Sequence, residues 1–317
     1  ISLLKFIENF INFYTNTDSD DKNYKKEKKP ISSSLDYSVK YFQEQFDKSV
    51  DLTIRHMLIS DTRAIAITIE GMTNKETLAN SVINPIMWGS YNGMTAPEKY
   101  EYLRYSLLSS AEQVEVKTYE DAFKFVMSGF AIIAVDGCDS MLAIGVQGFS
   151  FRGISEPSSE VMQRGSREGF VEPLRINMTL IRRRIKSPKL KFELMSAGDL
   201  SDTDICLCYL TDIVSPQILN KIRERIKNIN LKSVLASGYI SPYLEEKGDL
   251  SFFSSVGMSE RPDTACGKII EGRVVILVDG TPNALIVPYL FVEYFQNLED
   301  YDTRPYFATF TRWLKYI

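Results

Sequence analysis

The sequence predicts an α/β protein built from two related subdomains, and three observations lead to this prediction. The segment Gly272–Val287 (GRVVILVDGTPNALIV) repeats Gly129–Ile144 (GFAIIAVDGCDSMLAI) at an offset of 143 residues (272 minus 129). Each copy is typical of a strand, an Asp-Gly turn and a second strand. The helical segments before them, Glu120–Gly129 and Asp263–Gly272, keep the same offset.

The third observation lies upstream of these segments. Ser60-Asp61-Thr62 and Ser201-Asp202-Thr203 each lead into an apolar strand, at an offset of 141 residues (201 minus 60). Matches in one order at nearly one offset indicate an internal duplication. Strands alternate with helices, and several strands are too apolar to have one exposed face. We therefore expect a mixed β-sheet covered by helices in each subdomain.

The elements of the first subdomain follow in order. Ser33 or Ser34 is placed to cap a helix that runs to about Ser49, with a buried stripe that includes Phe42 and Phe46. Two strands and three helices precede the first Asp-Gly hairpin. The predicted ranges are Leu52–Ile59, Arg63–Glu70, a helix from Asn74, Pro97–Ser110 and Glu120–Ser128.

The second subdomain opens with a helix over Pro173–Lys186, in which Pro173 suits the first helical position. Strands at Lys191–Met195 and Asp204–Leu210 and a helix over Pro216–Asn228 come next. Leu231–Ser259 has no clear pattern. The predicted boundaries are 1–34 for an amphipathic segment plus disordered tether, 35–148 for the first subdomain, 149–169 for a charged Gly/Ser-rich linker, 170–298 for the second subdomain and 299–317 for an aromatic and basic pre-membrane segment.

Composition excludes several classes of function. A net charge of −4 gives no reason to expect nucleic acid as a partner. The four cysteines have no metal-ligand spacing and His56 is the single histidine, so we expect buried thiols and no metal or other cofactor. Walker A and GxSxG motifs are absent. An enzyme is not expected, and no catalytic residues are assigned.

The linker carries the candidate functional residues. Glu156, Glu160, Arg164, Arg167 and Glu168 alternate in charge among glycines, so they are suited to Arg–carboxylate bonds between the subdomains. Three interpretations stay open. The pairs lock two rigid units, they form a latch with alternative pairings that passes a signal, or Arg164 and Arg167 bind an anion.

Other charged motifs have structural explanations. Consecutive residues on a helix point in different directions, so Arg182-Arg183-Arg184 predicts a solvated face. Asp263 suits a helix N-cap, and Arg261 is placed to pair with Glu271 or Glu260. Both residues are retained as interdomain candidates. Asp136 and Asp279 are explained by the turns that follow them.

Two blocks, EPSSEVMQRGSREGF at 156–170 and ERPDTACGKIIEGRVVILVDGTP at 260–282, resemble the A subunit of spore nutrient-germinant receptors of the GerA type. Ser166 departs from the proline that the family motif has. The resemblance implies a two-subdomain domain on the cytoplasmic side of the spore inner membrane, followed in the family by transmembrane helices. It also implies B and C partner subunits, association with sister A subunits, and a role in the ion release that starts germination. The alternative is a small-molecule binding module with a nutrient in the cleft between the subdomains.

Overall fold

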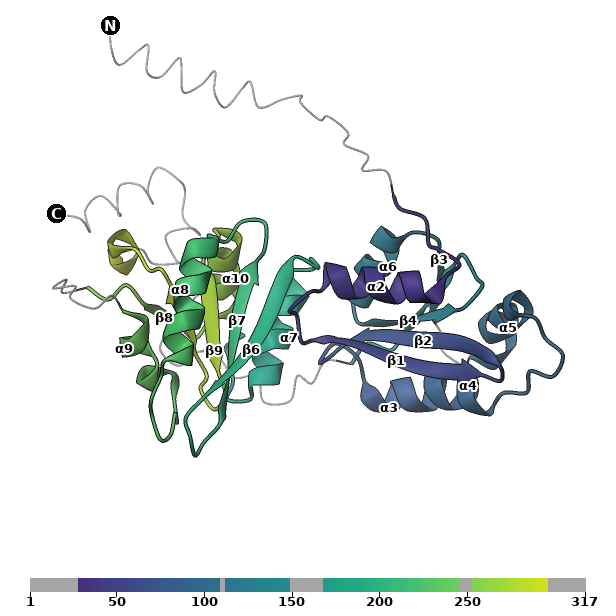
Figure 1. The fold of residues 1–317 in the computed structure, drawn as a ribbon, viewed down its shortest axis with the longest axis horizontal. Helices are drawn as coiled ribbons and strands as arrows, with labels where there is room; N and C mark the ends of the chain where they lie inside the picture. Colours follow the sequence, from purple (N-terminus) through teal and green to yellow (C-terminus); the bar gives the residue numbers. More distant parts are fainter. Residues whose placement is uncertain (1–27, 109–111, 149–167, 246–252, 296–317) are drawn as a thin grey trace, which may run out of the picture.

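The computed structural model describes residues 28–108, 112–148, 168–245 and 253–295, which form two α/β subdomains side by side (Figure 1). The first contains a five-stranded sheet in the order β1-β2-β4-β5-β3, and the second a five-stranded sheet in the order β6-β7-β9-β10-β8. Counted from the start of each subdomain, the two orders are identical. The predicted fold of two related subdomains is confirmed.

Helices and strands alternate through both subdomains. Those of the first are α2 (Leu35–Gln45), β1 (Leu52–Ile59), β2 (Thr62–Ile69), α3 (Lys75–Leu78), the π-turn η1 (Ala79–Ile83), α4 (Asn84–Trp88), α5 (Ala96–Tyr102), the π-turn η2 (Leu103–Leu107), β3 (Gln113–Val116), α6 (Tyr119–Val126), β4 (Phe130–Val135) and β5 (Met141–Gly145). Those of the second are α7 (Leu174–Arg184), β6 (Leu190–Ala197), β7 (Thr203–Leu210), α8 (Pro216–Lys227), the 3-10 turn η3 (Ser237–Tyr239), α9 (Ser241–Leu244), β8 (Gly257–Ser259), α10 (Pro262–Ile270), β9 (Val274–Val278), β10 (Ala284–Val287) and the 3-10 turn η4 (Phe291–Phe295).

The strand register repeats as well as the strand order. Ala64 of β2 lies opposite Val135 of β4, and Ile205 of β7 lies opposite Val278 of β9. The two pairs are related by the offsets of 141 and 143 residues found in the sequence. The duplication therefore extends to individual residue pairs in the sheets.

Every pairing among the described strands is antiparallel, whereas the sequence led us to expect mixed sheets. The apolar strands are explained by helices on both faces of each sheet. Ile65 and Ile67 of β2 join a core cluster with α2 and α6, while Ala64 and Ala66 join a cluster with α4 and α5. A strand that is buried on both faces lacks the alternation of polar and apolar residues that marks a half-exposed antiparallel strand. The sequence pattern therefore did not predict that the sheets are wholly antiparallel.

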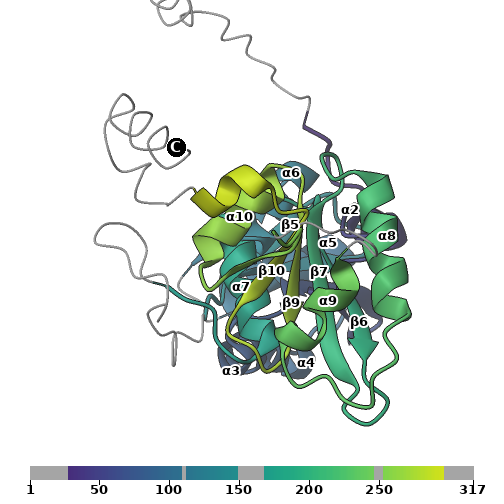
Figure 2. The ribbon, with the colours of Figure 1, turned by 90° about the vertical axis from the view of Figure 1, so that its left-hand side faces the viewer.

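The second sheet is covered in the same way. Figure 2 shows α7 and α10 on one side of the sheet and α8 and α9 on the other. Cys206 and Cys208 of β7 point into the cluster with α7 and α10, whereas Ile205 and Leu207 point into the cluster with α8. Each subdomain therefore has its own two-sided core.

Several predicted helix starts are confirmed by their caps. The Ser34 hydroxyl accepts a hydrogen bond from Tyr37 N at 3.4 Å, and Asn74 Oδ1 accepts one from Thr77 N at 3.0 Å. Pro173 is the N-cap of α7 and not its first helical residue, so the helix begins one residue later than we predicted. The short edge strands β3 and β8 were not predicted from the sequence.

Candidate functional site at the subdomain joint

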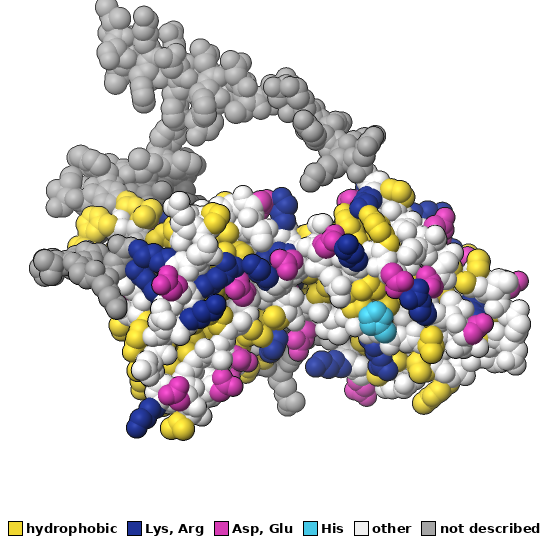
Figure 3. All heavy atoms as spheres, viewed as in Figure 1, with side chains coloured by type: hydrophobic (Ala, Val, Ile, Leu, Met, Phe, Trp, Pro, Cys, Tyr) yellow, Lys and Arg dark blue, Asp and Glu magenta, His cyan; other side chains and the backbone are white. Residues whose placement is uncertain are grey.

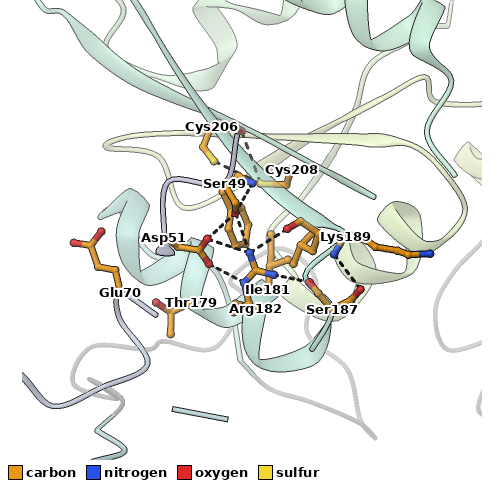
Figure 4. Close-up of polar contacts among 12 residues, drawn as sticks. Ser49, Asp51, Glu70, Thr179, Ile181, Arg182, Ser187, Lys189, Cys206 and Cys208 are labelled. Atoms are coloured by element: carbon orange, nitrogen blue, oxygen red, sulfur yellow. Dashed lines mark hydrogen bonds and ion pairs between the residues drawn. The ribbon is translucent and has the colours of Figure 1, made fainter. Parts of the chain in front are cut away.

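The joint between the subdomains is centred on Arg182 of α7, whose side chain is only 1% exposed. Its guanidinium faces the carboxylate of Asp51, which lies just before β1 in the first subdomain (Figure 4). Nε donates to Oδ2 at 2.7 Å and Nη2 donates to Oδ1 at 3.1 Å. This two-bond geometry matches the planar fork of arginine and fixes the orientation of both partners.

Arg182 donates three further hydrogen bonds. Nη1 donates to the Ser187 carbonyl at 2.8 Å, and Nη2 donates to the Leu190 carbonyl and to Ser49 Oγ, each at 3.1 Å. The guanidinium lies over the Phe192 ring, 4.7 Å from its centroid. A buried ion pair is tolerated when its other polar atoms are hydrogen-bonded, and this pair meets that condition.

The chain before β1 also bonds to the backbone of β6, the edge strand of the second sheet. Val50 N donates to the Phe192 carbonyl at 3.0 Å, and Phe192 N donates to Ser49 Oγ at 3.2 Å. Lys191 Nζ donates to the Gln45 carbonyl at 2.6 Å, and burial lowers the pKa of Lys191 to about 8. Two neighbouring residues of β6 are therefore bound to the first subdomain.

The middle and the N-terminal end of α7 also contact the first subdomain. Gly71 approaches Thr179 so closely that a Cβ atom at Gly71 would lie 2.0 Å from Thr179 Oγ1. One turn earlier on α7, Arg175 pairs with Glu70 at 3.1 Å, with both side chains partly exposed. The joint thus extends along most of α7.

The joint is built from corresponding parts of the two repeats. The loop between α2 and β1 supplies Ser49 and Asp51, and the helix–strand corner formed by α7 and β6 supplies Arg182 and Phe192. The duplicated units therefore meet through equivalent corners that carry different side chains.

Of the residues predicted from the linker, the structure describes one. Glu168 pairs with Arg183 at 3.3 Å and with Arg184 at 2.6 Å, both in the second subdomain. Glu156, Glu160, Arg164 and Arg167 lie outside the described residues. The aromatic and basic segment at 299–317 also lies outside them, as do residues 1–27 of the predicted amphipathic segment and tether.

The prediction for the arginine run was wrong at Arg182. We expected a solvated face, but helix α7 directs this one arginine into the joint while Arg183 and Arg184 stay partly exposed. Consecutive residues on a helix point in different directions, so the three arginines cannot share one surface. For the same reason, one of them can be buried while the other two stay at the surface. The sequence signal that could have found it is Asp51, a charged residue between the first predicted helix and the predicted strand Leu52–Ile59.

Arg261 and Asp263 lie in the second subdomain, on the turn that starts α10, and pair with each other. Arg261 Nη2 lies 2.5 Å from Asp263 Oδ2, and the arginine side chain is 1% exposed. The predicted N-cap role of Asp263 was wrong, because Arg261 occupies the N-cap and Asp263 lies in the first turn. Glu271, one of the two partners that we suggested for Arg261, pairs with Lys268 and Arg273.

The repeated Asp-Gly turns have a second structural role. Asp136 Oδ1 accepts a hydrogen bond from Leu35 N at 3.1 Å, and Asp279 Oδ1 accepts one from Leu174 N at 2.9 Å. Leu35 and Leu174 are the first residues of the equivalent helices α2 and α7, where backbone N–H groups lack intrahelical acceptors. The two aspartates therefore anchor the helix that opens each repeat.

The described residues contain no group of three or more His, Cys, Asp or Glu side chains that could hold a metal ion. All four cysteines are buried free thiols, as expected, and His56 is exposed on β1 (Figure 3). Burial raises the pKa of Cys138 to about 11 and that of Cys266 to about 12. Within the same residues, no helix has the length and hydrophobicity needed to cross a membrane.

The fold and the joint define the class of protein: a duplicated α/β domain in which a buried ion pair connects the two subdomains. The chain belongs to the Bacillus/Clostridium GerA spore germination protein family, whose model matches residues 40–317. The resemblance seen in the sequence is confirmed.

Individual relatives agree with this assignment. Spore germination protein KA of Bacillus subtilis (strain 168) is 36% identical over 288 residues, which cover 90% of this chain and 52% of that protein. Spore germination protein GerLA of Bacillus cereus is 30% identical over 287 residues, covering 90% of this chain and 58% of that protein. The chain thus spans about half the length of the curated relatives it matches.

A solved structure is similar over most of the chain. It is the crystal structure of the N-terminal domain of the A subunit of the Bacillus megaterium spore germinant receptor GerK3. It matches with a TM-score of 0.64 and 27% identity, over 84% of this chain and 99% of that chain. The two relatives described above and this solved structure are all named for spore germination.

Proposed function

We propose that this chain is the N-terminal domain of the A subunit of a spore germinant receptor and takes part in receptor assembly and in the signal that triggers ion release. The proposal is supported by the family match over residues 40–317 and by the similarity to the GerK3 A-subunit domain. The same proposal includes B and C subunits and sister A subunits as partners. It places the domain on the cytoplasmic side of the spore inner membrane.

The observation that carries a mechanical role is the buried Arg182–Asp51 pair. A signal that moves one subdomain reaches the other only if the joint resists bending. Two hydrogen bonds within the ion pair, backbone bonding at Phe192 and the close contact at Gly71 provide that resistance. We propose that the joint locks the subdomains into one unit during signalling.

A germination assay tests the lock. Spores that carry the full-length receptor with Arg182→Met should release ions and germinate more slowly in response to nutrient. Arg175→Met is the matched control, because Arg175 also bridges the joint from α7 but its side chain is 45% exposed. If both variants respond like the wild type at equal receptor abundance, the mechanical role is wrong.

The linker latch is a separate hypothesis from the lock. Glu156, Glu160, Arg164 and Arg167 remain candidates for pairings that change during signalling. Replacement of Arg167 by alanine tests the latch in the same spores. A stable, normally assembled receptor with an unchanged germination response would contradict it.

The alternative function is nutrient binding. We predicted a site in the cleft between the subdomains, and the cavity that favours testing this function lies instead within the second subdomain. A cavity of about 600 Å³ lies between α8 and α9 in the second subdomain, lined by Arg225, Asn228, Pro242, Tyr243 and Glu245. Opposite charges and an aromatic ring are suited to small polar ligands. Thermal-shift measurements with amino acids, sugars and nucleosides should show a saturable rise in melting temperature if the domain binds one of them.

A further inference from the structure

The first described residues, 28–34, form an arm that lies along the first subdomain beside α6 and β3 (Figure 1). We call this segment the N-terminal arm. Tyr119 N donates to the Lys29 carbonyl at 3.0 Å, and Ile31 N donates to the Lys117 carbonyl at 3.0 Å. Lys28 and Lys29 fall within the 1–34 segment for which we predicted a disordered tether, and in the structure they form part of this arm.

The Lys29 ammonium lies among three tyrosine rings. Its Nζ is 3.9 Å from the centroid of Tyr41, 5.1 Å from that of Tyr37 and 6.0 Å from that of Tyr119. These distances fall within the range of cation–π attraction. We call the three rings the tyrosine cage.

Contacts other than those with Lys29 fix the rings of the cage. Tyr119 is fully buried, and its hydroxyl is 2.8 Å from Ser38 Oγ and accepts a hydrogen bond from Ser32 N at 3.3 Å. The Tyr41 ring packs on Tyr119, with centroids 4.6 Å apart, and is stacked with Tyr37 at 6.2 Å. The cage is thus built by α2 and the start of α6, and it does not depend on lysine for its shape.

Acidic residues at the start of α6 hold the backbone and the neighbouring lysine. Lys28 Nζ donates to Asp121 Oδ1 at 2.7 Å, and Lys29 N donates to Glu120 Oε2 at 2.9 Å. The pKa of Lys29 lies above its ordinary value, mainly because its ammonium donates a hydrogen bond to Tyr37, which outweighs the opposing effect of burial. The ammonium therefore stays charged, as cation–π attraction requires.

We propose that the tyrosine cage is a binding site for ammonium cations, which Lys29 occupies from within the chain, and that this occupation holds the N-terminal arm on the first subdomain. An external alkylammonium ion would then compete with Lys29 and release residues 28–30. The site is distinct from the subdomain joint and does not rest on the proposed role in germination.

The arm is tested by hydrogen exchange in the full chain. Tyr119 is the first residue of α6, where a backbone N–H has no intrahelical acceptor, so its protection reports the bond to Lys29. Lys29→Met should accelerate exchange of this amide roughly two- to five-fold, the change expected for an exposed cation–π contact. Lys29→Arg, which keeps a cation, should stay close to the wild type.

Lys40→Met is the matched control, because Lys40 is an exposed lysine on α2 that pairs with Glu44 outside the cage. It should leave the exchange of the Tyr119 amide unchanged. If Lys29→Met exchanges like Lys40→Met, the cage does not hold the arm and the proposal is overturned.

The site itself is tested with tetramethylammonium as the probe. Saturable binding, followed by tyrosine fluorescence, is expected in the Lys29→Met variant and only weakly in the wild type. Adding Tyr41→Leu should abolish binding, whereas adding Tyr41→Phe, which keeps a ring, should preserve it. Absence of saturable binding to Lys29→Met, with its melting temperature unchanged, would overturn the ammonium site.

Discussion

Gly71 and Thr179 come from different subdomains, yet a single methyl group at Gly71 would fall 2.0 Å from the Thr179 hydroxyl oxygen. Gly71 also has a φ of +80°, in the left-handed region that glycine adopts readily. The Thr179 hydroxyl donates to the Arg175 carbonyl at 2.9 Å, so it cannot move away without losing that bond. Close packing at this point therefore depends on glycine for two separate reasons.

Replacing Gly71 with alanine should destabilise the protein through both effects. Backbone strain costs about 1–2 kcal/mol, and overpacking against Thr179 adds about 1–3 kcal/mol. Gly93→Ala is the matched control, because Gly93 has a similar φ of +74° with no atom within 4 Å of an added Cβ. Denaturant unfolding should show the larger loss at Gly71, and Thr179→Ala should recover part of it. Equal losses in the two glycine variants would contradict the packing argument.

Breaking the buried ion pair should cost more than breaking the exposed one. Arg182→Met leaves the Asp51 carboxylate buried without its cation, at a cost of about 3–5 kcal/mol in unfolding free energy. Arg175→Met, which removes the exposed pair with Glu70, should cost about 0–1 kcal/mol. A double variant, Arg182→Met with Asp51→Leu, should be more stable than the sum of its single changes predicts. Additive losses would show that the two residues do not act as a pair.

Lys191 should make stability depend on pH in the alkaline range. Burial lowers its pKa from 10.5 to about 8, so the folded state binds fewer protons than the unfolded state between these values. The unfolding free energy contributed by this group therefore rises from about pH 8 to about pH 10.5. The difference in unfolding free energy between wild type and Lys191→Met should move in favour of the wild type over that window. Parallel pH profiles would contradict the assignment.

Glu293 should stabilise the segment that follows β10, because its buried carboxylate accepts from Lys268 at 2.6 Å, from Arg273 and from Leu290 N at 2.8 Å. Burial tends to raise its pKa, but these hydrogen bonds outweigh burial and lower the pKa below 4.5. The stabilisation is then fully present above pH 4.5 and is lost as the pH falls through the folded-state pKa.

Acid titration of the unfolding free energy measures this effect. Glu293→Gln should be less stable than the wild type at neutral pH, and the difference should shrink in acid. Glu271→Gln is the control, because Glu271 pairs with the same lysine and arginine but is 51% exposed. A pH-independent difference at Glu293 would show that the loss comes from packing and not from charge.

The secondary structure was predictable where local pattern and core burial agree. Strand β1 has the predicted bounds, and the caps at Ser34 and Asn74 are where the sequence indicates them. Strands β3 and β8 were missed because they have four and three residues and lie at sheet edges, where few side chains need to be apolar. The sequence also did not predict the strand directions. Helices cover both faces of each sheet, so its antiparallel strands are as continuously apolar as the strands of a parallel sheet.

The candidate site was predicted only in part. The sequence indicated that the two subdomains meet through Arg–carboxylate pairs in the linker, which stays a prediction because most of the linker lies outside the described residues, and it did not indicate the pair at Arg182. Arg182 looked like one of three solvated arginines, and its partner Asp51 lies 131 residues away in the chain. No local sequence pattern predicts which of three neighbouring side chains faces the other subdomain.

By itself, the sequence determined the duplication, the hairpins with their Asp-Gly turns and the family, because these depend on repeated local patterns and on long matched blocks. Tertiary structure alone decided how the repeats are joined, which arginine is buried, and that Lys29 lies in a cage of tyrosines. Such contacts bring together residues that are distant in the chain, and their free energy depends on burial and geometry that exist only after folding.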